Sequence, residues 1–243
     1  MRSLAAMIDG HEDLAEVIAS FATDWLMPLT PGDGCAEEEL VAAEARLGLR
    51  LPAALRTTYR LVGLREALVR TQDYLLEPSR LHLVDANRML VFRIENQNVT
   101  QWAVPVDALD LDDPPVLFRL DELSTGDGGW ARFMDRLSLA CFEMVLSECL
   151  FSGANDLCDN RELDEAAVDE LERGFGRLAL PDYPLWAARD GSPVRWFGSG
   201  EVILREDGRQ WLWARAKTPE ALQRLRQALP GEWHENAVQQ IDI

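Results

Sequence analysis

Apolar side chains recur at helical spacing in three runs near the beginning of the chain. Residues 12–26, 37–47 and 51–62 each place apolar positions three or four residues apart, as one buried face of a helix requires. Between the second and third runs, Gly48 suits a left-handed helix end and Pro52 suits the first turn of a new helix. The pattern therefore predicts three amphipathic helices, the last two joined by a short connector.

The hydrophobic period changes after residue 80. The stretch "RMLVFRIENQNVTQWAVPV" (88–106) is typical of two strands around the polar turn "ENQN", and "PPVLFRL" (114–120) predicts a third strand. Residues 129–151 return to a helical apolar pattern. Residues 161–173 then predict a helix whose exposed side is strongly acidic.

The last third of the chain changes period again. Residues 193–216 contain three strand-like runs, and Asp207–Gly208 indicates a tight turn within the final hairpin. Thr218 suits the N-cap of a last helix that ends near residue 229. Helices and strands follow one another without a repeating βαβ unit, so we expect an α+β fold with a central antiparallel sheet flanked by helices.

Trp211 and Trp213 are two positions apart, so they share one face of their strand. We expect that face to pack in the core against the final helix. A binding patch of exposed aromatic side chains is the alternative.

The charge of the chain limits which partners it can bind. The chain has 42 acidic and 24 basic residues, a formal net charge of −18. A field of this sign repels nucleic-acid phosphates and anionic lipids and speeds association with basic partners. Residues 156–172 alone carry eight acids and one base. We therefore expect a protein partner, and neither a nucleic acid nor a membrane.

The motifs of catalysis and cofactor binding are weak. The stretch "GDGGWA" (126–131) matches a dinucleotide fingerprint only in form, because no strand leads directly into it. The three histidines and four cysteines, at 11, 82, 234 and at 35, 141, 149, 158, show no metal-ligand spacing. We expect no enzyme activity, no cofactor and no metal. The N-terminus lacks the apolar core of a signal peptide, which favours a cytoplasmic protein.

The connector region resembles the signature of the SUKH superfamily. The residues that carry this resemblance are Glu44, Leu47, Gly48, Leu51, Pro52 and Tyr59. The later "LVFRIENQNVTQWAV", "DDPPVLFRLD" and "SLACFEMVLSECLF" are similar to that family's central strands and following helix. Val62–Gly63–Leu64 stands where the family tends to have an Asn-Gly-like turn.

The resemblance covers about residues 35–151 and implies a single SUKH-like domain spanning residues 1–243. Residues 152–243 would add the acidic helix and a C-terminal β-hairpin followed by a helix, with the hairpin extending the same sheet.

The same resemblance implies a function. Bacterial SUKH proteins are frequently immunity proteins, which bind and neutralise a toxin domain, whereas eukaryotic relatives suggest a regulatory or scaffolding module with an endogenous partner. Many toxins are basic nucleases, which an acidic inhibitor can occlude. We predict that the partner-binding acids are Asp110, Asp112, Asp113, Glu162, Asp164, Glu165, Asp169 and Glu170.

Overall fold

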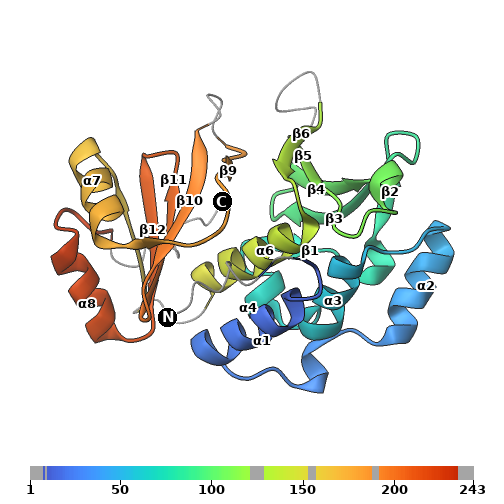
Figure 1. Ribbon diagram of the computed structural model, residues 1–243, viewed down its shortest axis with the longest axis horizontal. Coiled ribbons are helices and arrows are strands. Elements are labelled where there is room, and N and C mark those ends of the chain that lie inside the picture. Colours follow the sequence, from blue (N-terminus) through green and yellow to red (C-terminus); the bar gives the residue numbers. More distant parts are fainter. Residues whose placement is uncertain (1–7, 9, 121–128, 153–156, 188–191, 235–243) are drawn as a thin grey trace. The chain divides into compact units, whose positions relative to one another are not determined.

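The computed structural model describes residue 8 and residues 10–120, 129–152, 157–187 and 192–234 (Figure 1). It shows an α+β protein with antiparallel sheets, as the sequence predicts. Contacts divide the chain into two compact units, which we call the N-terminal unit (residues 7–148) and the C-terminal unit (residues 149–243). Each unit contains its own six-stranded sheet. The prediction that the C-terminal hairpin extends the first sheet is therefore wrong.

The N-terminal unit begins with helices and continues into the first sheet. Its helices are α1 (Leu14–Trp25), α2 (Glu37–Leu47), α3 (Ala53–Val62), α4 (Glu66–Val69) and α6 (Leu137–Phe151), whose last residues belong to the C-terminal unit. Short 3-10 helices are η2 (Pro31–Asp33), η3 (Pro78–Arg80) and η4 (Val106–Ala108). Its strands are β1 (Asp73–Leu75), β2 (His82–Val84), β3 (Met89–Glu95), β4 (Thr100–Pro105), β5 (Val116–Leu120) and β6 (Ala131–Met134). They pair in the order β1-β3-β4-β5-β6, with β2 also on β3.

The connector between α2 and α3 explains the spacing of its residues. Gly48 ends α2 in the left-handed region, at φ +70°. The carboxylate of Glu44 accepts a hydrogen bond from the backbone of Leu51 at 2.9 Å and another from Arg56 at 2.8 Å. Tyr59 is buried and donates its hydroxyl to a backbone carbonyl just after β1. The tight connector thus fixes the angle between two helices and ties α3 to the sheet.

One face of the first sheet carries the core of the N-terminal unit, and α1, α3 and α6 lie on that side (Figure 1). Trp102 pairs with Arg93 and Phe118 in register, so all three side chains share this face. Leu117 and Arg119 therefore point to the opposite face.

A charged cluster lies inside this core. The guanidinium of Arg93 donates to Asp73 at 2.6 Å and to Glu143 at 2.8 Å, and it lies 3.9 Å from Glu148. It also lies over the ring of Trp102, 4.5 Å from the ring centroid. Glu148 in turn accepts backbone hydrogen bonds from the segment that leads into β1. The cluster links β1, β3 and α6.

The C-terminal unit is a sheet with two helices on one face. Its elements are β7 (Cys158–Glu162), α7 (Glu165–Gly174), β8 (Gly176–Arg177), β9 (Tyr183–Pro184), β10 (Pro193–Gly198), β11 (Val202–Asp207), β12 (Trp211–Ala216) and α8 (Pro219–Ala228). The strands pair in the order β7-β12-β11-β10-β8, with β9 also on β10. The predicted turn after Asp207 and the predicted cap at Thr218 are both confirmed.

The two tryptophans of β12 do not pack against the last helix. Leu212 and Ala214 join Leu222 and Leu225 of α8 in one apolar cluster. Because side chains alternate along a strand, Trp211 and Trp213 point to the opposite face, where their ring centroids lie 5.8 Å apart. They share one face, as predicted, but the expected packing against α8 is wrong.

Two predicted helices begin later than expected. Residues 131–134 form β6, so the helix predicted over 129–151 begins at Leu137. The helix predicted over 161–173 is α7, which begins at Glu165 after strand β7. In both cases an adjacent strand supplies backbone hydrogen bonds, and this tertiary pairing overrides the local preference. Of the "GDGGWA" stretch, residues 126–128 lie outside the described residues.

Candidate functional site

The predicted acids fall on both units, so we consider them as two separate surfaces. Asp110, Asp112 and Asp113 follow η4 in the N-terminal unit; the first two are exposed and the third is partly buried. The others lie in the C-terminal unit, at the end of β7 and on α7. These are Glu162, Asp164, Glu165, Asp169 and Glu170.

Two of the eight predicted acids have structural roles. Asp164 is the N-cap of α7, and its carboxylate accepts a hydrogen bond from the backbone of Ala167 at 2.8 Å. Asp113 accepts hydrogen bonds from both the backbone, at 2.8 Å, and the hydroxyl of Ser138 in the first turn of α6. Both carboxylates satisfy donors at helix N-termini. Their oxygens are therefore less available to a partner than the sequence suggests.

Of the other described acids in the 156–172 segment, some form ion pairs with arginines and some do not. Asp159 is buried and pairs with Arg226 of α8 at 2.5 Å. Glu172 lies 3.5 Å from Arg195 and 3.3 Å from Arg209. These partners come from distant parts of the chain, so the sequence pattern did not reveal them.

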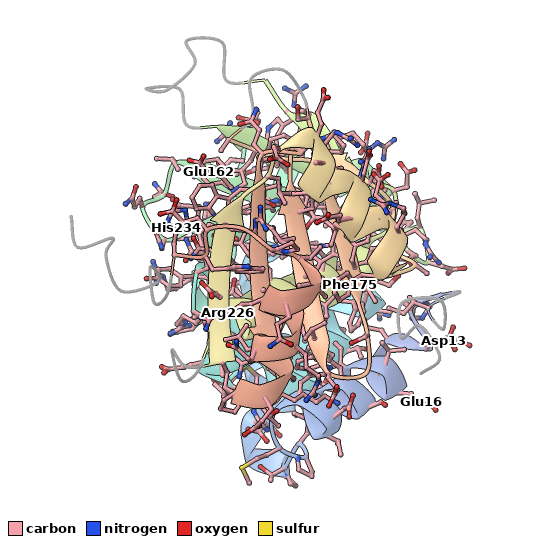
Figure 2. The ribbon with its side chains drawn as sticks, turned by 90° about the vertical axis from the view of Figure 1, so that its left-hand side faces the viewer. Asp13, Glu16, Glu162, Phe175, Arg226 and His234 are labelled. Carbon is pink, nitrogen blue, oxygen red and sulfur yellow. The ribbon has the colours of Figure 1, made fainter. Side chains whose placement is uncertain are left out.

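Besides the cap Asp164, four acids of this segment take part in no ion pair within the described part of the chain. We call them the α7 acidic surface: Glu162, Glu165, Asp169 and Glu170. Helix α7 buries Ala167, Val168 and Leu171 against the sheet, which leaves its acids on the outer side. Figure 2 shows α7 and α8 in front of the strands of this unit, with Glu162 labelled at the end of β7. Glu162, Glu165 and Asp169 are exposed and Glu170 is partly buried. Asp110 and Asp112 in the other unit are exposed and take part in no ion pair among the described residues.

The side chains of the described residues form no cluster of three or more His, Cys, Asp or Glu suited to a metal ion. The four cysteines are buried, and none of them forms a disulfide within the described residues. Burial raises the pKa of Cys35 to about 11 and that of Cys141 to about 12, so both stay protonated near neutral pH. Neither thiol has the lowered pKa of a nucleophile.

A cavity lies on the second face of the first sheet, to which Leu117 points, and was not predicted from the sequence. Its volume is about 510 Å³. The sheet contributes Met89 and Leu117, η4 contributes Val106 and Asp107, and Trp130 forms a further side. The turn between β2 and β3 contributes the remaining residues, Asp85, Asn87 and Arg88. The lining is apolar at the sheet and polar where the turn and η4 meet solvent.

The position of Trp130 is fixed by two contacts. Its indole N–H donates to the carboxylate of Asp85, and the guanidinium of Arg119 lies over its ring at 4.7 Å from the centroid. Arg119 also donates to Asp85 at 3.0 Å. The Trp130 and Arg119 contacts hold the pKa of Asp85 below its ordinary value. Trp130 is thereby presented to the cavity as an ordered flat surface.

The turn between β2 and β3 has an unusual backbone. Three successive residues, Asp85, Ala86 and Asn87, have φ values of 54°, 54° and 65°. Left-handed geometry is unfavourable for residues with a Cβ, and of these three residues only Ala86 lacks a polar side chain that could compensate. Strain of this kind persists where surrounding contacts over-determine the backbone, often beside a functional site.

Within the described residues, no helix is both long and apolar enough to cross a membrane. No family model matches the chain, and neither a curated protein nor a solved structure matches it.

Proposed function

We propose that this chain is a non-catalytic, cytoplasmic binding protein that neutralises a basic bacterial toxin domain by covering it, with the α7 acidic surface in the interface. The observation that carries the proposal is the set of four unpaired acids on the outer side of α7 and β7. Like charges at this spacing repel one another and bring no compensating contact within the fold. A basic partner would relieve that repulsion.

The resemblance to the SUKH superfamily and the net charge of −18 both support an immunity function. A long-range negative field raises the rate at which a basic partner arrives, while the local acids define where it docks. The regulatory-module alternative shares this protein-binding surface but requires an endogenous partner.

Co-expression tests the proposal. Any toxin-like domain encoded beside this gene would be induced with and without this chain, and survival would be scored. We expect rescue together with a complex that weakens as salt rises. Failure to rescue, with no complex at low salt, would contradict immunity and favour the regulatory alternative.

A charge-matched pair of variants tests the surface. One variant carries Glu162→Gln, Glu165→Gln, Asp169→Asn and Glu170→Gln; Asp164 is kept because it caps α7. The control carries Glu12→Gln, Glu16→Gln, Glu38→Gln and Glu66→Gln, four exposed acids of the N-terminal unit. Both variants lose four negative charges, so the long-range field changes equally. We expect association at low salt to slow about tenfold more in the first variant. Equal slowing would exclude the α7 acidic surface as the docking site.

A further inference from the structure

The cavity of the N-terminal unit lies outside the surface proposed above and has its own chemistry. A volume of about 510 Å³ falls within the range of roughly 300–1,000 Å³ that small-molecule sites occupy. Met89, Val106 and Leu117 provide an apolar base, and Trp130 provides a flat aromatic side. This interior suits one or two bulky apolar groups.

The edge of the cavity carries one available cation and one available anion. Arg88 uses its Nε to donate to the carbonyl of Asp85 at 3.1 Å, which leaves the terminal nitrogens of its guanidinium exposed. Asp107 is exposed, and neither residue takes part in an ion pair within the described part of the chain. The charge of Asp85, by contrast, is already matched by Arg119.

The two charged residues are held near each other without pairing. The backbone N–H of Val106 donates to the carbonyl of Arg88 at 2.8 Å, which joins the β2–β3 turn to the start of η4. Arg88 directly follows the left-handed backbone at Asp85–Asn87. The edge therefore presents opposite charges from two neighbouring segments, the β2–β3 turn and η4, beside an apolar interior.

We propose that this cavity binds a short hydrophobic peptide in its zwitterionic form, of about the size of a dipeptide. Its carboxylate meets Arg88, its ammonium group meets Asp107, and its apolar side chains lie on Met89, Leu117 and Trp130. A ligand with only one charge would leave the other edge residue without a partner.

The probe is leucyl-phenylalanine, compared with its C-terminal amide and its N-acetyl form. Binding to the full chain would be measured by calorimetry and by the indole N–H signal of Trp130, which Trp130→Phe identifies. We expect the dipeptide to shift that signal, and each blocked form to bind about fivefold more weakly, as exposed charge pairs allow.

Two variants assign each charge to its residue. Arg88→Gln should remove the advantage of the free carboxylate and keep that of the free ammonium group; Asp107→Asn should do the reverse. Arg80→Gln and Glu66→Gln, which change equally exposed charges away from the cavity, should leave all three affinities unchanged. If both blocked forms bind as tightly as the free dipeptide, the proposal of a zwitterionic ligand is overturned. Absence of binding up to about 10 mM would overturn the site itself.

Discussion

Arg93 of β3 donates to Glu143 of α6 at 2.8 Å, and both side chains are buried in the core of the N-terminal unit. The same guanidinium also contacts Asp73 and lies near Glu148, so one cation serves three carboxylates. A buried cluster with more anions than cations is costly to assemble. Its stability therefore depends on Arg93 more than on any one acid.

Replacing Arg93 by methionine should lower the free energy of unfolding by about 3–5 kcal/mol at neutral pH, because buried carboxylates lose their cation. Urea denaturation measures this. Arg132→Met is the control, since Arg132 forms an exposed pair with Asp135 at 3.5 Å, and it should change stability by less than about 0.5 kcal/mol. A loss below about 1 kcal/mol for Arg93→Met would contradict the role assigned to the cluster.

Glu148 should make stability depend on pH. Burial raises its pKa to about 7, above its ordinary value of 4.5, so the folded state binds the proton more tightly than the unfolded state. Its contribution is fully present below pH 4.5 and is lost as pH rises through about 7, with a total of about 3 kcal/mol.

Urea denaturation between pH 4.5 and 7.5 would show this decline. Glu148→Gln should flatten it, whereas Glu165→Gln, on the exposed side of α7, should leave the slope unchanged. Parallel pH profiles for wild type and Glu148→Gln would show that another group titrates.

The acids near α7 should differ in what they stabilise. Asp164→Ala removes the N-cap of the helix and should cost about 1 kcal/mol of unfolding free energy. Asp169→Asn removes only an exposed charge and should change stability by less than about 0.5 kcal/mol. Thermal unfolding of the two variants distinguishes them, and similar losses would mean that Asp169 also supports the fold.

Ala86→Gly should stabilise the protein. Ala86 is exposed and has φ 54°, a conformation that costs a residue with a Cβ about 1–2 kcal/mol but costs glycine little. After the entropy that glycine loses on folding, we expect a gain of about 0.5–1 kcal/mol. The same substitution at Ala42, exposed in the middle of α2, should lower stability by about 1 kcal/mol. Two losses of similar size would show that the turn is not strained.

The sequence by itself determined the elements whose signals are local. Apolar spacing predicted α1, α2, α3 and α8, apolar strand-like runs beside turn residues predicted β3, β4 and the C-terminal strands, and Gly48, Asp207–Gly208 and Thr218 marked their ends. These signals are reliable because a cap, a turn or an amphipathic face depends on residues close together in the chain. The excess of acids between residues 156 and 172 was also plain from composition.

Only the tertiary structure decided which charges are available. Asp159 and Glu172 belong to the same acidic run as Asp169, yet arginines from β10, from the turn between β11 and β12 and from α8 neutralise the first two. Strands β6 and β7 form because neighbouring strands supply their hydrogen bonds, and the cavity brings together residues from 85 to 130. Burial and ion pairing depend on which segments lie close together in the folded chain. When those segments are far apart in the sequence, no local pattern predicts their contact.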